Sequence, residues 1–208
     1  RPGVLESIIS NIASSLPPNG QLIVYYLGRG EHRLRAGTDQ VFLATPAFTP
    51  ARTKTSLALV DILAALSQAP RALLIIDAPV TGPDTLENIS TSPVAGITRG
   101  VRLITASATI CVDTSAVVSP FSLMVDRALR RAHDLPGLAS ATELAMQIIS
   151  DAHAAQLSAI PQAYVDNTAN DVVVGEREIG GVGLFENCAN LIGNIYDPCA
   201  GSREDGIN

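Results

Sequence analysis

The sequence predicts one α/β domain in which a mostly parallel sheet is flanked by helices on both faces. Two short segments, 22–27 and 72–76, are continuously apolar, which is typical of strands buried on both faces. Segments with apolar residues at helical spacing alternate with them, and such alternation requires crossover connections between parallel strands. A chain of 208 residues with 47% hydrophobic content can bury one substantial core but not two.

The expected elements of the first half of the chain follow from its apolar spacing. Residues 4–15 carry apolar side chains with a helical period, and the prolines that follow end the helix. Residues 22–27 form the first strand. Residues 40–45 are a short apolar run that fits a small strand or one arm of a hairpin. Residues 56–68 again have a helical period, so we expect a helix that packs on the sheet.

Three further strands are expected in the second half. Residues 72–76 are the second buried strand, and residues 101–107 are the third. Between them lies a long connection rich in Ser, Thr, Pro and Gly over 80–100, of a length that is usually functional in a compact domain. Residues 172–174 are the last short strand candidate.

Capping residues mark the starts of two more helices. Ser119 followed by Pro120 is typical of a cap and a first helical turn, and the apolar spacing continues to about residue 129. Ser140 with Glu143 has the spacing of a capping box, and this helix should run to about residue 157.

The domain assignment and the charge pattern limit the classes of partner. We place the α/β domain at 1–175 and expect 176–208, which is Gly-rich at its start and weakly periodic, to be an irregular C-terminal extension. The formal net charge of -6 disfavours nucleic-acid binding. Three arginines at helical spacing fit a solvated helix face: Arg127, Arg130 and Arg131.

Hydropathy and cysteine usage predict a soluble cytoplasmic protein. No apolar run approaches the roughly 20 residues of a membrane span, and the first residues lack the apolar core of a signal peptide. Cys111, Cys188 and Cys199 are odd in number and far apart, so they form no disulfide framework. The three histidines have no cysteine or carboxylate at metal-ligand spacing, so we expect no metal and no cofactor.

Two of the expected strands run into loops that resemble the two halves of a cysteine-protease active site. Strand 22–27 runs into Gly28-Arg29-Gly30, and strand 72–76 runs into the segment 77–82, Asp-Ala-Pro-Val-Thr-Gly. The pair resembles the caspase-like family (caspases, metacaspases and their bacterial relatives), where the loops read Gly-His-Gly and Asp-Ala-Cys-x-Ser-Gly. Residues 101–107 and 119–122 resemble the strand and the helix opening that follow in that family. The resemblance implies a three-layer α/β/α fold.

The same comparison predicts that the reaction is lost. Arg29 stands where the family has its histidine, and Pro79 stands where it has its nucleophile. Proline has neither a nucleophilic atom nor a backbone N–H, and an arginine side chain is permanently charged and cannot act as a base. Peptide hydrolysis by cysteine needs a thiolate, an imidazole and oxyanion donors. We therefore expect a pseudoenzyme with a degenerate dyad.

Three functions remain open at this stage. The first is a catalytically inactive domain that binds protein, as a regulatory partner of an active protease or as a scaffold. The alternative is an active cysteine endopeptidase with a relocated dyad of His32 and Cys111, although His32 between two charged neighbours is more simply a solvated loop residue. The third is a purely structural domain within a larger protein. The partner class in the first function is an analogy with the family.

The candidate binding residues are Asp77, Arg29 and the two glycines that flank it, Gly28 and Gly30. In family members that cut after basic residues, the acid before Ala-Cys helps to bind the substrate's Arg or Lys, and Asp77 matches that position. One interpretation is therefore a surviving pocket for a basic side chain. The interpretation we favour from sequence is that Asp77 pairs with Arg29 of the same molecule and that the cleft is self-occluded.

One departure from the family concerns the edge of the sheet. Relatives begin with a buried strand and a helix, and that first strand lies beside the strand that ends in the Gly-His-Gly loop. The present sequence lacks this segment, so residues 22–27 would be an apolar edge strand. Because proteins normally cover such edges, we expect upstream residues of a longer polypeptide or another chain to complete the sheet.

Overall fold

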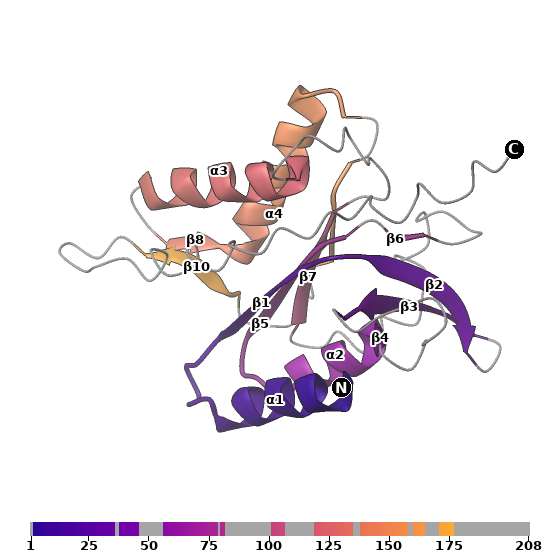
Figure 1. Cartoon of the computed structure of the whole chain (residues 1–208). Coiled ribbons are helices and arrows are strands. Elements are labelled where there is room, and N and C mark those ends of the chain that lie inside the picture. Colours follow the sequence, from indigo (N-terminus) through magenta and orange to yellow (C-terminus); the bar gives the residue numbers. More distant parts are fainter. Residues whose placement is uncertain are drawn as a thin grey trace, which may run out of the picture.

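The structure is a computed structural model that describes residues 2–35, 38–45, 56–78, 80–81, 101–106, 119–134, 138–157, 160–164 and 171–176. Figure 1 shows the arrangement of its helices and strands. In chain order they are α1 (Pro2–Ser15), β1 (Leu22–Leu27), β2 (Gly30–Arg35), β3 (Thr38–Ala44), β4 (Ser56–Ala58), α2 (Leu59–Leu66), β5 (Ala72–Asp77), β6 (Val80–Thr81), β7 (Val101–Thr105), α3 (Pro120–Asp134), β8 (Leu138–Ser140), α4 (Ala141–Ala154), β9 (Gln162–Tyr164) and β10 (Val173–Glu176).

The main sheet has the strand order β1-β5-β7-β9. The pairs β1–β5 and β5–β7 are parallel, whereas β9 joins β7 antiparallel. The α/β class with a mainly parallel sheet is therefore confirmed. Strands β1 and β7 lie within the ranges that their apolar composition predicts, and β5 extends one residue beyond its predicted range, to Asp77. Strand β9 was not predicted, because a three-residue strand is too short to show a period.

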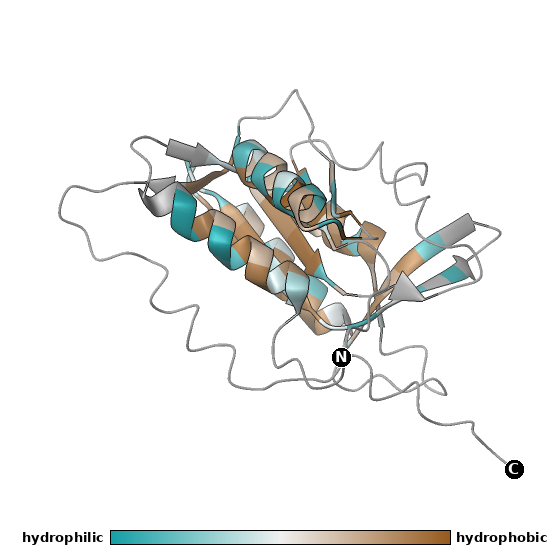
Figure 2. Cartoon of the chain, turned by 90° about the horizontal axis from the view of Figure 1, so that it is seen from above, coloured by the Kyte–Doolittle hydropathy of each residue, from teal (hydrophilic) through white to brown (hydrophobic). Residues whose placement is uncertain are grey.

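Helices lie on both faces of this sheet, with α1 and α2 below it and α3 and α4 above it in Figure 1. Side chains alternate along β5. Leu74 and Ile76 join the core between the sheet and helices α1 and α2, whereas Leu73 and Ile75 join the core between the sheet and helices α3 and α4. Every residue of β5 is buried. Figure 2, seen from above, shows apolar strands beside helices that carry both hydrophilic and hydrophobic residues. Burial on both faces explains the unbroken apolar composition of β5.

A second sheet, of order β4-β3-β2-β6, extends from the loop after β1. Its centre is an antiparallel hairpin of β2 and β3, so the prediction of a hairpin arm near 40–45 is confirmed. The expectation that His32 is a loop residue is wrong, since it lies in β2 opposite Val41. Strand β2 was missed because its sequence, Gly-Glu-His-Arg-Leu-Arg, is polar, and pairing with β3 rather than apolar burial holds it.

The helix starts agree with the capping residues in two cases. Before α3, the Ser122 backbone N–H donates to Ser119 Oγ at 2.9 Å. At α4, the Glu143 N–H donates to Ser140 Oγ at 3.2 Å, and the Ser140 N–H donates to the Glu143 carboxylate at 2.8 Å, which completes the capping box. The helix expected over 56–68 is shorter, because residues 56–58 pair with β3 as strand β4.

Several expectations fall on residues that the structure does not describe. They concern most of the connection over 80–100, the extension after residue 176, and the cysteines Cys111, Cys188 and Cys199. Within the described ranges, no helix is both long enough and apolar enough to cross a membrane. In the same ranges, no group of His, Cys, Asp or Glu side chains is arranged to hold a metal ion.

Candidate binding site at the carboxyl edge of the sheet

The two loops singled out in the sequence lie next to each other at the carboxyl edge of the main sheet. Strand β1 pairs with β5 in a register that places Leu27 opposite Asp77. The Gly28 N–H then donates to the Asp77 carbonyl at 3.1 Å, which extends the pairing one residue beyond β1. Because ligands of open α/β sheets bind at this edge, the two loops define the candidate site.

Gly28 and Tyr26 fix the shape of the first loop. The Tyr26 hydroxyl lies 2.8 Å from the Arg29 carbonyl and 2.7 Å from the Ala44 carbonyl, and it shares its proton between them. A Cβ atom at Gly28 would lie 2.6 Å from this hydroxyl. Only glycine therefore lets the loop close over Tyr26 without a shift. The Ala44 N–H donates to the Arg29 carbonyl at 2.8 Å and ties the loop to β3.

Asp77 is the buried acid of the site, with 5% of its surface exposed. Its Oδ2 atom accepts short hydrogen bonds from the hydroxyls of Ser119 and Ser122, and the Tyr25 hydroxyl oxygen lies 3.3 Å from the same atom. The hydroxyls of Tyr25 and Ser122 are also 2.9 Å apart. Protons can be assigned consistently if Tyr25 donates to Ser122 and both serines donate to Asp77. We call Asp77, Tyr25, Ser119 and Ser122 the Asp77 cluster.

The expected ion pair between Asp77 and Arg29 is not among the contacts of the described residues. The alternation of side chains along β5 explains the difference. Asp77 follows Leu73 and Ile75, which both face α3 and α4, so its carboxylate points at the start of α3. Hydroxyl groups of that helix start take the place that we assigned to Arg29.

The start of helix α3 suits a negative charge. Ser119 has two roles there, because its Oγ accepts the Ser122 N–H and donates its own proton to Asp77. The positive end of the helix dipole adds a favourable interaction with a carboxylate at this place. The site therefore holds one anionic group among preorganised donors.

Tyr25 connects this site with the free edge of the sheet. Tyr25 is 42% exposed, although its hydroxyl contacts Asp77 and Ser122. Burial of the hydroxyl raises the pKa of Tyr25, and the negative charge of Asp77 raises it further. The phenol therefore stays protonated and acts as a hydrogen-bond donor at any physiological pH.

The remaining predicted site residues are only partly described. Arg29 lies at the carboxyl edge and is half-buried, whereas Pro79 and Cys111 lie outside the described residues. His32 is placed in β2, but its side chain is not described. The relocated dyad therefore stays a hypothesis from sequence. Sequence reasoning missed Tyr25, Ser119 and Ser122 as site residues, although the strand alternation 73, 75, 77 is a signal that could have directed Asp77 toward α3.

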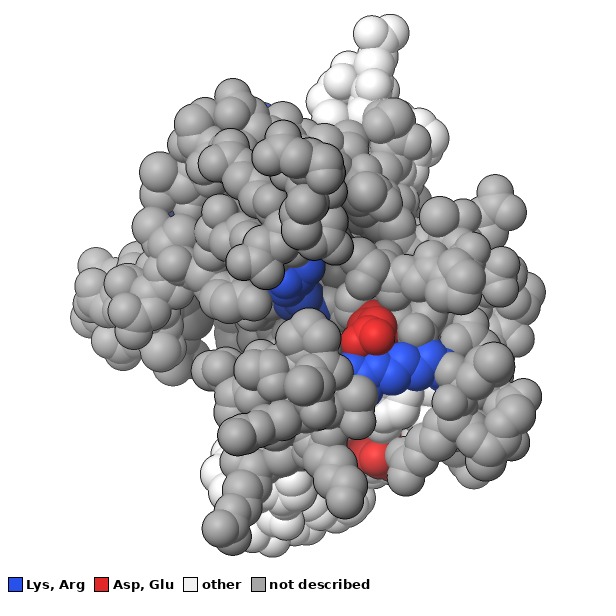
Figure 3. Space-filling model, turned by 45° about the vertical axis from the view of Figure 1, so that its right-hand side comes forward, with Lys and Arg blue, Asp and Glu red and all other residues white. Residues whose placement is uncertain are grey.

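Most of the face in Figure 3 belongs to residues outside the described ranges, and in its described part an acidic side chain adjoins a basic one. Within the second sheet, Arg33 pairs with Glu31 and also lies over the ring of Phe42, 5.3 Å from its centroid. In the portion of this face that is described, no area of a single sign stands out.

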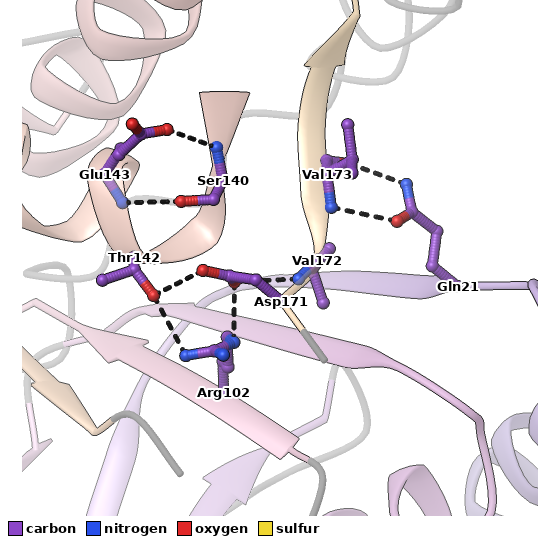
Figure 4. Close-up of polar contacts among 8 residues, drawn as sticks. All are labelled: Gln21, Arg102, Ser140, Thr142, Glu143, Asp171, Val172 and Val173. Carbon is purple, nitrogen blue, oxygen red and sulfur yellow. Dashed lines mark hydrogen bonds and ion pairs between the residues drawn. The ribbon is translucent and has the colours of Figure 1, made fainter. Parts of the chain in front are cut away.

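A second buried polar network lies near the opposite end of the sheet and has a structural role (Figure 4). Arg102, in β7, is paired with Asp171 at 2.7 Å and donates to Thr142 Oγ1 at 3.0 Å. The Thr142 hydroxyl in turn donates to Asp171 at 2.6 Å. Gln21 exchanges two hydrogen bonds with the Val173 backbone, at 2.7 and 3.1 Å. These contacts join β10 and α4 to the main sheet.

Comparison with known proteins shows the fold alone. No family model matches the sequence, and no curated protein matches it. Among solved structures, the chain is similar to protein GSU0716 from Geobacter sulfurreducens, with a TM-score of 0.52 and 12% sequence identity. The match covers 78% of this chain and 72% of the other. It supports a mixed α/β fold for this chain.

Proposed function

We propose that this chain is a catalytically inactive caspase-like domain that acts by binding protein, either as a regulatory partner of an active protease or as a scaffold. The observation that carries the proposal is the adjacency of the two loops. Because β1 and β5 are parallel neighbours, Arg29 and the segment that begins at Asp77 meet at one edge, as the resemblance requires of a dyad. A cation and a proline replace the imidazole and the thiol.

Neither substituted residue can supply the chemistry of peptide hydrolysis. The Arg29 guanidinium cannot accept a proton from a nucleophile, and Pro79 offers neither a nucleophile nor an oxyanion donor. A reaction that needs both partners is lost when both are replaced.

The Asp77 cluster is suited to bind a basic side chain of a partner protein. Within the described residues, all three hydroxyls of the cluster contact Oδ2, and none of these contacts goes to Oδ1. The carboxylate is thus held in one orientation, and Oδ1 is the oxygen that would accept the guanidinium or ammonium group of the partner. Charge-assisted bonds of this type are about twice as strong as neutral ones. Arg29 at the same edge disfavours a second cation and limits the affinity.

A thiol-reactive activity probe tests the loss of catalysis. We expect the folded protein to show no activity-dependent labelling, with Cys111→Ser as the matched control for labelling of that thiol. Labelling at Cys111 that disappears in His32→Ala would instead establish the endopeptidase with a relocated dyad.

Peptide binding tests the proposed role of Asp77. A peptide with a central arginine should bind at least about tenfold more tightly than the same peptide with neutral citrulline, because citrulline keeps the shape and loses the charge. Asp77→Asn should remove this difference, and Arg29→Gln should increase the affinity. Asp126→Asn is the control, since Asp126 lies on the exposed face of α3 and pairs with Arg130. Equal affinity for both peptides would contradict the proposal.

A further inference from the structure

The first observation concerns the backbone of β1, the edge strand of the main sheet in the described chain. The Leu22 N–H donates to Arg71 and the Gly28 N–H donates to Asp77, both across to the β5 side. In a parallel pair the backbone groups of alternate residues point to the same side. The N–H and C=O groups of Ile23, Tyr25 and Leu27 therefore point away from β5, toward the open edge.

The side chains of these residues are also exposed. The exposed fraction is 40% for Ile23, 42% for Tyr25 and 48% for Leu27, whereas every residue of β5 is buried. No residue of β1 carries a charge. Natural edge strands usually carry lysine, proline or a bulge that blocks further pairing, and β1 has none of these among its six residues. The six residues of β1 therefore contain nothing that would block the pairing of another strand at this edge.

Helix α1 presents a second apolar surface at the same edge. Ile9 and Ala13 face the core, and the Ser10 hydroxyl donates to Gln68 at the end of α2. Four large apolar side chains lie roughly a quarter turn from the core side, opposite to Ser10. They are 43–53% exposed: Val4, Leu5, Ile8 and Ile12.

The place of α1 puts this stripe beside β1. Figure 1 shows α1 beneath β1 and in front of α2. Leu22, Val24 and Tyr26 of β1 pack against the core that contains Ile9 and Ala13. Since Ser10 marks the α2 side of the helix, the stripe lies on the outer side, next to the open edge.

We propose that a second copy of this chain occupies the β1 edge. The occupant must be an extended, uncharged strand with apolar side chains on both faces, because it would lie between the α1 stripe on one face and Ile23, Tyr25 and Leu27 on the other. Strand β1 itself, Leu-Ile-Val-Tyr-Tyr-Leu, meets this description. A two-fold axis perpendicular to the sheet would pair the two β1 strands antiparallel and keep like faces together.

The register follows from the outward backbone groups. With Tyr25 opposite Tyr25 of the second copy, Ile23 lies opposite Leu27, and each pair exchanges two N–H···O=C bonds. Because α1 lies beneath β1, the α1 helices of the two copies would approach each other across the axis. Their apolar stripes would face each other, and the one charged residue of α1, Glu6, lies outside the stripe.

The apolar surface is large enough for a specific dimer. With on the order of 200 Å² for a fully exposed large side chain, the exposed fractions of these seven residues give about 600 Å² per copy, or about 1,200 Å² per dimer. This area lies at the lower end of standard interfaces. The proposal is independent of the chemistry of the Asp77 cluster, because it depends on β1 and α1.

Sedimentation velocity of the full chain tests the proposal. We expect a dimer at micromolar concentration that dissociates on dilution. Ile23→Lys should weaken association at least about 100-fold, because it would bury a charged group opposite Leu27 of the second copy in an apolar interface. Ile8→Lys should also weaken it. Met146→Lys is the matched control, since Met146 is 67% exposed on α4, and it should leave association within about twofold.

Amide exchange measured by NMR identifies the occupant. In the dimer, the amides of Ile23, Tyr25 and Leu27 should be protected, and in Ile23→Lys this protection should be lost while Val24 and Tyr26 stay protected by β5. A protein that is monomeric at every concentration overturns the proposal. If its outward amides are nevertheless protected, another segment of the polypeptide covers the edge. A dimer that Ile23→Lys leaves intact also overturns it.

Discussion

Removal of the Asp77 carboxylate should destabilise the fold by about 2–4 kcal/mol. Hydrogen bonds to a charged group are worth about 1.5–3 kcal/mol each, and the hydroxyls of Ser119 and Ser122 donate to this carboxylate. The total is less than their sum, because Tyr25 and Ser122 can still bond to each other and Ser119 can still accept the Ser122 N–H. Asp77→Asn keeps an acceptor oxygen and should cost about 1–2 kcal/mol.

Urea unfolding monitored by circular dichroism measures these changes. Asp126→Ala is the control on the exposed face of α3, and it should change the free energy of unfolding by less than about 0.5 kcal/mol. Ser119→Ala removes a cap as well as a donor, so its own cost should be about 1–2 kcal/mol. A double-mutant cycle between Asp77 and Ser119 separates the shared hydrogen bond from the cap, and we expect a coupling of at least about 1 kcal/mol.

Two results would refute this reasoning. If Asp77→Ala cost less than about 1 kcal/mol, the carboxylate would not be held by the Ser119 and Ser122 hydroxyls. If the cycle showed no coupling, Ser119 and Asp77 would act independently, and the helix start would not orient the carboxylate.

Three further predictions concern other contacts. Because the pKa of Tyr25 is raised in the folded state, its stabilising effect is fully present below the ordinary tyrosine pKa of about 10 and is lost as the pH rises further. The stability advantage of wild type over Tyr25→Phe in urea should therefore be constant between pH 8 and about pH 9 and shrink as the pH rises from about 10 to about 11. Arg102→Met leaves the Asp171 charge unpaired and should cost about 2–4 kcal/mol in the same assay, and Asp171→Leu in addition should recover part of it, since an apolar pair can replace a buried ion pair. Ser140→Ala breaks the capping box of α4 and should cost about 1 kcal/mol, whereas an equal stability would show that the box contributes nothing.

The elements that the sequence predicts are those with a clear local signal, either a regular apolar pattern or a capping motif. Strand β5 is buried on both faces and reads as a continuous apolar run, and α4 begins at a complete capping box. The missed strands have no such signal. Strands β6, β8 and β9 have only two or three residues. Strand β2 is polar and is held by its pairing with β3, so its sequence shows no apolar pattern. Tertiary pairing, which a single segment cannot reveal, determines them.

The candidate site was predictable in its place and unpredictable in its partners. The parallel pairing of β1 and β5 brings the two loops together. This adjacency could be expected from the sequence, because both strands are recognisable from their apolar composition. The partner of Asp77 depends on which face of the sheet residue 77 occupies, and on the return of the chain to that face 42 residues later at Ser119. The loop that contains Arg29 lies next to Asp77, but the direction of side chains along β5 turns the Asp77 carboxylate toward Ser119 instead.

Tyr25 connects the binding site with the proposed interface, and this connection follows from its geometry. Its hydroxyl belongs to the Asp77 cluster, while its backbone N–H and C=O point to the open edge of β1. Pairing of two β1 strands would restrict the position of Tyr25 and, through its contact with Ser122, the start of α3. Association at the edge would therefore hold the Asp77 carboxylate more rigidly, and a bound cation at Asp77 would in turn favour association, because coupling between two sites is reciprocal.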